Sequence, residues 1–379
     1  MQSYDVVVVG SGVIGLSCAW RLREQGRRVA VFDPTPGHGA SAIGAGMLAP
    51  VSEATWHDTT LVELNIRAAS GWPSFANELE EKSGDPTGFR SCGTIQVAFD
   101  SSDRAALEEI CEFKRSLGLE ATWCAPTQLR AIEPLLSPGV RGGIWAPSEH
   151  QVDNRLLVRA LKDVVAATGV TRISRSVDRI ELEGGTVRGV VSDGEVNTAT
   201  LVVLAAGHAA GRIGGLPVGV VPEIRPVKGQ ILRLRTRDGA RFTDSTVRAL
   251  VNGSSVYVVS RDDGGVVAGA TQEEKGEDLS VEAGAMHQIL RDSLRVLPGL
   301  EELELAEFSA GLRPATRDHL PVIGPAAVDG LILALGHFRN GILLADVTSR
   351  AVAEYAERGE LPQWCAPFAP GRLKEPVAL

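Results

Sequence analysis

The chain has 379 residues, of which 44% are hydrophobic and 22% charged, a composition typical of a globular protein. Because a single hydrophobic core rarely supports this length, we expect about two domains. The formal net charge of −9 and the lack of a dense lysine or arginine run argue against a nucleic acid partner. No apolar run approaches the ~18 residues of a membrane helix, and the five scattered cysteines contain no CxxC pair. We therefore expect a cytoplasmic protein with reduced thiols and no membrane partner.

The N-terminal residues predict a strand, a glycine-rich turn, a helix and a second strand. Residues 6–9 are all valine, which is typical of a strand buried on both faces of a parallel sheet. A Gly-x-Gly-x-x-Gly turn follows at 10–15, and the next apolar residues keep helical spacing as far as Gly26. The second strand covers 27–33 and ends at Asp33, 18 positions after Gly15.

This turn has the arrangement of a dinucleotide-binding site. Gly10 permits the tight turn, Gly12 lets the backbone approach a pyrophosphate, and Gly15 lets the helix pack closely on the strand. The N-terminus of the helix presents unpaired N–H groups and a partial positive charge to the phosphates. Asp33 can accept hydrogen bonds from ribose hydroxyls and would repel a 2′-phosphate, which disfavours NADP. These residues alone do not separate NAD from FAD.

The middle of the chain predicts further helices and a second sheet. Apolar residues at three- and four-residue spacing predict helices at 60–79, which we expect Pro73 to interrupt, and at 103–117 and 155–167. Short segments between 170 and 204 indicate strands that return to the first sheet. Segments at 226–235, 255–259 and 266–271 predict the strands of a second, more antiparallel sheet, and a helix is predicted beside it at 282–296.

The C-terminal part again has the character of the nucleotide-binding region. It predicts a strand at 331–335, a glycine-bounded turn at 336–341 and a long helix at 342–358. The residues from 362 on are rich in proline, and we expect them to be loosely held.

A second glycine-rich segment directly follows Asp33 and reads GASAIGAGMLAP at 39–50. Its small residues let the backbone lie against a flat ring, which favours FAD over NAD. The segment resembles the flavin-contacting loop of the D-amino-acid oxidase superfamily, and its GMLAP ending is most similar to the glycine oxidases of thiamine biosynthesis. Further segments are similar to the same family, in the same order along the chain: QVDNRL at 151–156, RPVKGQ at 225–230, GLRPAT at 311–316 with LPVIG at 320–324, and GHFRNGILL at 336–344.

The resemblance implies an α/β fold whose FAD-binding domain is Rossmann-like, with glutathione-reductase-like topology. A second α+β domain, built on a mostly antiparallel sheet, would bind the substrate. Both domains would be discontinuous in sequence. We expect the FAD-binding domain to contain 1–85, 150–215 and 315–379, and the substrate-binding domain to contain 86–149 and 216–314.

The resemblance also implies which residues contact FAD, and the lack of cysteine between 225 and 341 predicts non-covalent binding. The ADP half would contact Gly10, Gly12, Val13, Ile14, Gly15, Asp33 and Pro34. The pyrophosphate and isoalloxazine would contact Ala40, Ser41, Ala45, Gly46 and Met47. Val177 would contact adenine, and the same site would include Ala206 and Gly207. The last glycine turn would lie beside the flavin pyrimidine through His337, Phe338, Arg339, Asn340, Gly341, Ile342 and Leu343. A helix N-terminus near Asn340 would stabilise negative charge on a reduced flavin.

For the substrate, the resemblance implies a site that holds a carboxylate. Arg313 would pair with it in a fork geometry that lysine cannot reproduce, Tyr257 would donate a hydroxyl hydrogen bond, and Arg339 would contact the substrate beside the flavin. The implied activity is hydride transfer from Cα of glycine or another small amine, with molecular oxygen as the final acceptor. Hydrolysis of the imine would give glyoxylate or another 2-oxo acid, ammonia and hydrogen peroxide. The family also implies a homotetramer, and the histidines show no metal-ligand spacing.

Two positions depart from the pattern of glycine oxidases. Gln272 stands where an apolar methionine is usual near the substrate, and Asp346 stands where proline is common. The first change leaves the substrate open among glycine, sarcosine and small D-amino acids. The alternative within the same class is a sarcosine or small D-amino-acid oxidase or dehydrogenase. A flavoprotein without turnover is a further alternative, which the retention of Tyr257, Arg313 and Arg339 disfavours.

Overall fold

The computed structural model describes residues 2–54, 56 and 59–373 of the chain. Its first sheet has the strand order β19-β20-β13-β1-β2-β9. The strands are β1 (Val6–Val9), β2 (Val29–Phe32), β9 (Thr171–Ile173), β13 (Leu201–Leu204), β19 (Val322–Pro325) and β20 (Leu331–Leu335). All neighbours are parallel except β19 and β20. The predicted parallel sheet, and the return of the C-terminal chain to it, are confirmed.

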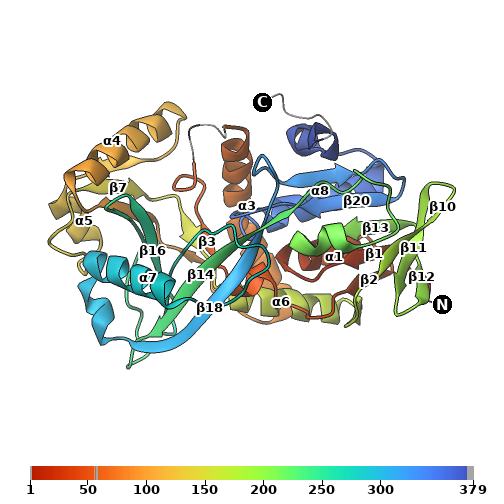
Figure 1. Ribbon diagram of the computed structural model, residues 1–379, viewed down its shortest axis with the longest axis horizontal. Coiled ribbons are helices and arrows are strands. Elements are labelled where there is room, and N and C mark those ends of the chain that lie inside the picture. Colours follow the sequence, from red (N-terminus) through yellow and green to blue (C-terminus); the bar gives the residue numbers. More distant parts are fainter. Residues whose placement is uncertain (1, 55, 57–58, 374–379) are drawn as a thin grey trace.

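The valine run of β1 is buried on both faces of this sheet. Val6 and Val8 share an apolar core with the helices α1 (Val13–Glu24), α3 (Thr59–Ser83), α6 (Asn154–Ala167) and α8 (Ala345–Arg358). Val7 and Val9 share another core with the antiparallel sheet of β10 (Arg179–Glu183), β11 (Thr186–Ser192) and β12 (Glu195–Thr198). Helices therefore cover one face and a small sheet covers the other (Figure 1). No helix in the described ranges is long and apolar enough to cross a membrane.

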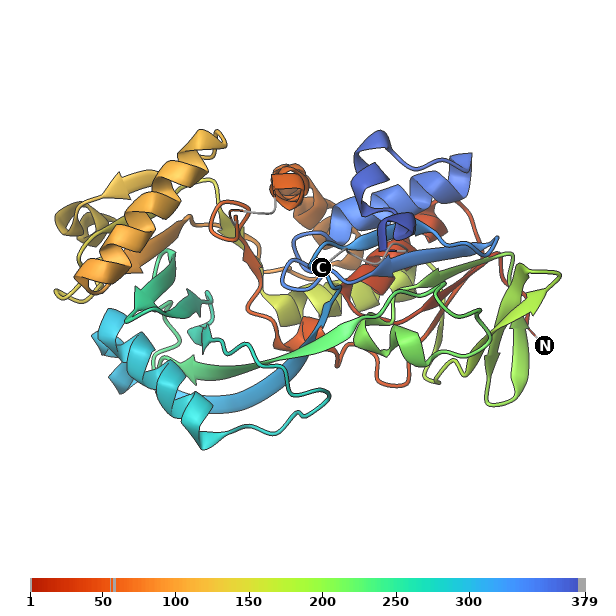
Figure 2. The ribbon, with the colours of Figure 1, turned by 45° about the horizontal axis from the view of Figure 1, so that its top comes forward.

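A second sheet has the strand order β18-β14-β17-β16-β15-β5-β7-β6, and all its neighbours are antiparallel except β5 and β15. Its strands are β5 (Thr94–Ala98), β6 (Thr122–Cys124), β7 (Gly143–Ala146), β14 (Arg225–Arg235), β15 (Thr246–Val251), β16 (Ser254–Ser260), β17 (Gly265–Gly269) and β18 (Glu304–Ala315). The helices α4 (Ser101–Ser116) and α7 (Ala283–Val296) pack on it. Figure 2 shows the two large sheets in separate halves of the molecule, with β14 and β18 running between the halves.

The strands of each large sheet come from the segments expected for one domain, apart from the last residue of β18, Ala315. A small sheet of β3 (Met47–Leu48), β8 (His150–Gln151) and β4 (Arg90–Ser91) uses strands from both sets. The domain boundaries themselves stay a prediction. Two further helices are short. α2 (Ala40–Ile43) lies beside the glycine turn, and α5 (Pro126–Ile132) lies at the far end of the second sheet.

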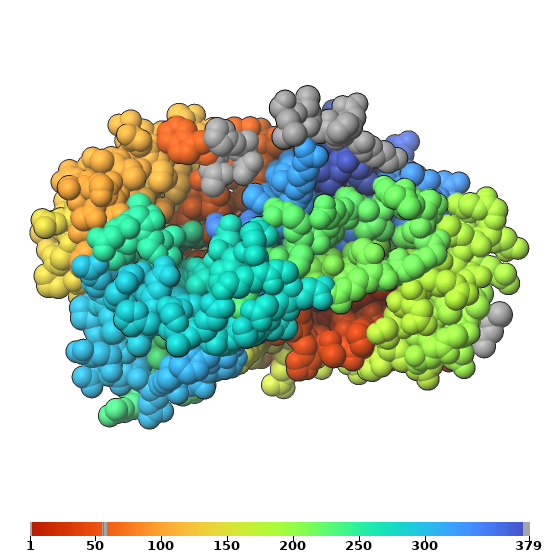
Figure 3. Space-filling view, in the orientation of Figure 1, coloured from red at the N-terminus to blue at the C-terminus, as the bar shows by residue number. Residues whose placement is uncertain are grey.

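The connection between β17 and α7, residues 270–282, is fastened to the rest of the molecule by ion pairs. Lys228 on β14 is fully buried and donates to Asp278 over 2.6 Å. Arg225 pairs with Glu274 over 2.7 Å, and Arg212 pairs with Glu277. Figure 3 shows the cyan surface around this connection directly beside the green surface of the segment that follows β13. The connection is therefore held against the residues that follow β13.

Three expectations from the sequence are wrong. Pro73 does not interrupt α3, because it lies on the exposed side while the neighbouring Trp72 is buried and donates its indole N–H to the carbonyl of Leu343 over 2.8 Å. The last helix, α8, begins only at Ala345, so the residues from Gly341 to Leu344 form turns. The segment after residue 362 forms two 3-10 helices, and Phe368 is 2% exposed in the main core. The expectation of a loosely held tail is thus wrong up to residue 373, and 374–379 lie outside the described residues.

Candidate active site

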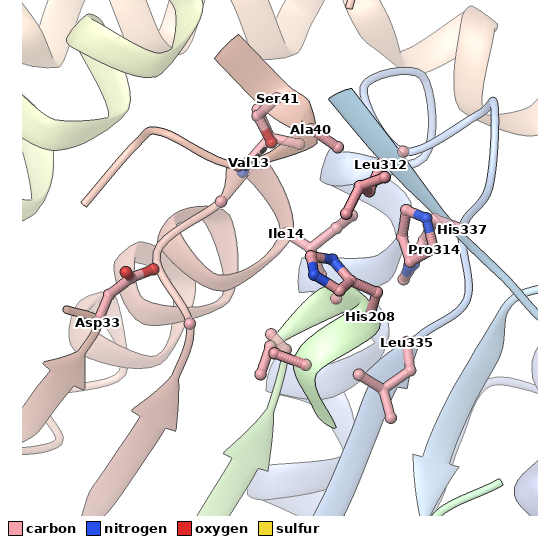
Figure 4. Close-up of a pocket in the computed structure, with 18 of the residues that line it drawn as sticks. Val13, Ile14, Asp33, Ala40, Ser41, His208, Leu312, Pro314, Leu335 and His337 are labelled. Atoms are coloured by element: carbon pink, nitrogen blue, oxygen red, sulfur yellow. Dashed lines mark hydrogen bonds between the residues drawn. The ribbon is translucent and has the colours of Figure 1, made fainter. Parts of the chain in front are cut away.

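A cavity of about 530 Å³ opens at the carboxyl ends of the parallel strands. In open α/β sheets this is the edge at which ligands bind. The wall is formed by residues that follow β1, β2, β13 and β20, together with the 39–44 segment and the end of β18. Figure 4 shows Asp33 at one end of the arrangement, Val13 and Ser41 at the start of α1, and Pro314 and His337 on the opposite side.

The glycine turn brings the N-terminus of α1 to the cavity. Gly10 has a φ of +106°, and a Cβ there would lie 2.4 Å from the carbonyl oxygen of Ala205 on the next strand segment. A Cβ on Gly15 would lie 1.9 Å from the carbonyl oxygen of Gly10, so only glycine lets the helix start this close to the strand. Gly12 caps α1, and the amide of Val13 donates to the Ser41 hydroxyl over 3.1 Å. The turn therefore leaves backbone N–H groups facing a space that a pyrophosphate fits.

Asp33 is held at the rim by three hydrogen bonds. Its Oδ2 accepts from the amide and the hydroxyl of Ser11 over 2.7 and 2.9 Å, and its Oδ1 accepts from the amide of Thr35 over 2.8 Å. Each oxygen keeps lone pairs for a ribose hydroxyl. The glycine cradle, the helix N-terminus and this fixed carboxylate together fit the adenosine diphosphate half of FAD. Ser11 was not expected from the sequence, because its role depends on the fold that brings it to Asp33.

Most of the residues expected to contact FAD line this one cavity. They are Gly10, Gly12, Val13, Ile14, Asp33, Pro34, Ala40, Ser41, Val177, Ala206, Gly207, His337, Phe338, Arg339, Gly341 and Ile342. Other expected residues lie outside the wall: Gly15, Ala45, Gly46, Met47, Asn340 and Leu343. Gly15 and Leu343 support the wall from the core side, and a Cβ on Gly46 would lie 1.9 Å from the carbonyl oxygen of Val152. The individual contacts with FAD stay predictions.

The surroundings of both histidines of the wall favour the neutral imidazole. Burial lowers the pKa of His337 to about 3, and its Nε2 lies 3.0 Å from the hydroxyl of Thr348. Burial, together with the charge of Arg212, also lowers the pKa of His208, which the sequence did not single out. The expected helix N-terminus near Asn340 is replaced by turns, since the first helical residue is Ala345. Any stabilisation of negative charge there would come from turn amides and from arginine.

Arg313 lies on β18 at the end of the cavity. Its Nη1 donates to the carbonyl oxygens of Thr271 over 3.1 Å and of Lys228 over 3.5 Å. Burial lowers the pKa of this guanidinium, which has no carboxylate partner within the described residues. Gly229 makes room for it, because a Cβ at that position would lie 2.3 Å from Nη1.

Tyr257 on β16 is close to Arg313, although it does not form part of the cavity wall. Burial raises the pKa of its hydroxyl, and the charge of Arg313 opposes this effect. The ring packs against an apolar cluster of Ala45, Ile231, Val259 and Val267. The hydroxyl is therefore a neutral donor beside the guanidinium, as a carboxylate site requires.

Arg339 belongs to a charged cluster at the mouth of the cavity. Its Nη1 donates to Glu53 over 3.3 Å, and its Nη2 donates to the side-chain oxygen of Gln272. The other carboxylate oxygen of Glu53 accepts from Arg248. Burial alone would raise the pKa of Glu53, but Arg248 and Arg339 lower it to about 2, so the carboxylate stays ionised. Arg339 keeps 43% of its side chain exposed.

No motif or spacing in the sequence points to Glu53 or Arg248. Glu53 lies just after the second glycine-rich segment, and Arg248 lies on β15 of the other large sheet. No fixed spacing connects either residue to Arg339. Only the packing of the segment after β3 against the second sheet brings the three side chains together.

The comparison with known proteins agrees with this geometry. Residues 5–355 match the model of the family DAO, described as FAD dependent oxidoreductase. The glycine oxidase of Geobacillus kaustophilus is 32% identical, over 97% of this chain and 96% of its own length. The bifunctional protein ThiO/ThiG of Trichormus variabilis is 33% identical over 93% of this chain but only 52% of its own length. The chain thus spans about half the length of the first curated relatives it matches. The crystal structure of the Geobacillus kaustophilus enzyme superposes with a TM-score of 0.90 and 31% identity, each chain being covered completely.

A parallel sheet with a glycine turn, a fixed acidic strand end and a cavity that reaches a half-buried arginine defines a flavin-dependent oxidoreductase. The chain belongs to the DAO family of FAD-dependent oxidoreductases. Its cofactor is FAD. The expected family, FAD-dependent oxidoreductases with relatives among the glycine oxidases, is confirmed.

Proposed function

We propose that this chain oxidises glycine, and small amines such as sarcosine or D-alanine, to glyoxylate or the 2-oxo acid, ammonia and hydrogen peroxide, and that it serves thiamine biosynthesis. The observation that carries the proposal is Arg313. A half-buried guanidinium that is bonded only to two carbonyls among the described residues needs an anion. A substrate carboxylate supplies one. The similarity to glycine oxidase over nearly the whole chain supports the choice of substrate.

In this proposal the side chains bind and orient the substrate. Arg313 pairs with the carboxylate, and the neutral Tyr257 hydroxyl donates to it, which fixes the direction of the Cα–H bond. Bound FAD supplies the acceptor for the two electrons and the hydride. Tyr257, Ile43, Met47 and Ala270 all pack against one apolar cluster, and in this proposal their bulk limits the space beside the carboxylate and favours small substituents. Glu53 stays ionised and holds Arg339 at the mouth.

A sarcosine or small D-amino-acid oxidase or dehydrogenase is the second candidate. The observation that favours it is Gln272, whose amide bonds to Arg339 at the mouth and so changes the surface that a substituent on nitrogen or Cα would meet. Peroxide formation separates an oxidase from a dehydrogenase, because a dehydrogenase passes its electrons to an acceptor other than oxygen.

The test is a panel of glycine, sarcosine and D-alanine with simultaneous measurement of oxygen uptake, peroxide and ammonia. We expect Arg313→Ala to raise KM for the best substrate about 10- to 100-fold while FAD stays bound, since the side chain is assigned to the substrate carboxylate and not to the cofactor. Arg317→Ala is the matched control, because Arg317 lies four residues further on an exposed turn. An unchanged KM in Arg313→Ala would contradict the carboxylate site.

The assembly and the location belong to the same proposal. The expected homotetramer and the expected cytoplasmic location stay predictions. Light scattering of the purified holoenzyme measures the first, with a mass of four chains as the expected result.

A further inference from the structure

The cavity and its mouth carry more positive charge than a single substrate carboxylate can neutralise. At the mouth Arg248 and Arg339 both contact Glu53, and Arg313 lies at the end of the same cavity. The charge of Arg339 is close enough to Arg313 to lower the pKa of its guanidinium. Tyr257 adds no charge, because burial raises the pKa of its hydroxyl. Three guanidinium groups and one carboxylate leave two positive charges in this cluster.

The two surplus charges differ in position. Arg313 is the half-buried one at the end of the cavity, and a first carboxylate on it removes one charge. Arg339 forms part of the same wall but is 43% exposed, at the mouth. A single small carboxylate on Arg313 leaves this second charge in place. A ligand with two acidic groups would neutralise both charges and remove the repulsion between them.

Arg339 and Gln272 also keep unused hydrogen-bond donors. Arg339 gives one N–H to Glu53 and one to Gln272, and within the described ranges its Nε and its remaining N–H groups have no acceptor. Gln272 accepts that bond through its side-chain oxygen, which turns its NH₂ group away from the guanidinium. Its NH₂ group has no acceptor in the described part of the chain. A guanidinium and a neighbouring amide with free donors form a site for a carboxylate.

We propose that the substrate site has a second acidic subsite, formed by Arg339 and Gln272, so that the enzyme prefers small amines that carry two carboxylates. This inference rests on the proposed function, since Arg313 must hold the first carboxylate. The second carboxylate can sit on the nitrogen substituent, as in iminodiacetate, or on the side chain, as in D-aspartate. Both present the same chemistry to Arg339, and the experiment separates them.

The first measurement is binding to the holoenzyme and needs no turnover. Diglycolate and methoxyacetate are ether analogues of iminodiacetate and sarcosine that lack an oxidisable amine, and they differ by one carboxylate. We expect diglycolate to bind about tenfold more tightly by titration calorimetry. Equal or weaker binding of diglycolate overturns the proposal. If diglycolate binds more tightly but no amine is oxidised, the proposed function fails while the acidic subsite stands.

The second measurement is turnover in matched pairs. The ratio of kcat/KM for iminodiacetate over sarcosine, and for D-aspartate over D-alanine, shows on which atom the second carboxylate is accepted. We expect one ratio to exceed about five. Both ratios below one, with glycine still oxidised, overturn the acidic subsite and leave the proposed function intact.

The third measurement assigns the subsite to Gln272. We expect Gln272→Met, which keeps the length but removes the amide, to lower the preferred ratio and the tighter binding of diglycolate about threefold or more. Glu274→Gln is the matched control, because it changes an exposed side chain two residues further that pairs with Arg225. If the control lowers the ratio as much as Gln272→Met does, the effect is one of general charge and the assignment is wrong.

Discussion

The substitution Gly229→Ala, which should displace Arg313, tests most directly how the carboxylate site is built. Gly229 lies on β14, opposite Gly311 of β18, without a positive φ, so the strand itself accepts alanine. The added Cβ would lie 2.3 Å from Nη1, 2.5 Å from Cζ and 2.5 Å from Nη2 of Arg313. Ordinary contacts are about 3.5–4 Å, so the guanidinium must move by roughly 1 Å or more. The movable group is the end of a flexible side chain, and we therefore expect the fold to persist.

Displacement of Arg313 would cost the substrate about one charge-assisted hydrogen bond, or about 1.5–3 kcal/mol. At about 1.4 kcal/mol per factor of ten, Gly229→Ala is expected to raise KM for the best substrate about 10- to 100-fold. Oxygen uptake gives kcat and KM, and the flavin spectrum on titration with acetate gives the Kd of a carboxylate that is not oxidised. FAD content should not change, because Gly229 does not line the cavity.

The control for this substitution is Gly284→Ala, an exposed glycine in α7 whose added Cβ would meet no atom within 4 Å. A double variant sharpens the reasoning. If Gly229 acts only through Arg313, then Gly229→Ala combined with Arg313→Ala should be no worse than Arg313→Ala alone. A KM and an acetate Kd both within twofold of the wild type would refute the argument from steric displacement.

Further predictions concern the cofactor and the buried charges. Asp33→Asn removes the negative charge from the acceptor expected for the ribose hydroxyls, and we expect FAD to bind about tenfold or more weakly in a fluorescence titration of the apoprotein; an unchanged Kd would contradict that role. Acid precipitation should release all the flavin into the supernatant, and a yellow pellet would disprove non-covalent binding. Lys114 donates to Gln96 over 3.0 Å, and burial lowers its pKa from 10.5 to about 8. Between pH 8 and 10.5 the lysine at position 114 is protonated in the unfolded chain but neutral in the folded one. The free energy of unfolding should therefore rise with pH over this range by up to about 3 kcal/mol relative to Lys114→Met. Urea unfolding of both proteins at pH 7 and pH 10 measures this gain, and parallel pH profiles would rule it out.

The parts of the site that the sequence predicted are those defined by local chemistry. Gly10, Gly15 and Asp33 follow from a turn in which each position has its own steric or hydrogen-bonding requirement, and the structure shows the close contacts that exclude a side chain. Arg313 could be singled out only through the resemblance, because an arginine on a strand carries no mark of its function. Its carbonyl partners, Thr271 and Lys228, come from segments that meet only in the folded sheet.

The charged cluster at the mouth could not be predicted, for a related reason. Glu53, Arg248 and Arg339 come from distant parts of the chain, and any one of them alone would be expected on the surface.

The error at Pro73 has a different origin. Local propensity disfavours proline inside a helix, but the buried Trp72 before Pro73, with its hydrogen bond, and the buried Phe75 after it hold the helix to the core.

The strand order of the first sheet determines when a newly made chain can bind FAD and become yellow. β1 pairs with β13, and β13 pairs with β20, so the cavity wall depends on residues from the first ten positions and from positions beyond 330. A chain emerging from the ribosome carries the glycine turn long before β20 exists to complete the other side. Flavin capture is therefore a late step in biogenesis. A chain cut short before Leu331 should stay colourless, and yellow colour in a cell reports chains whose synthesis has passed that point.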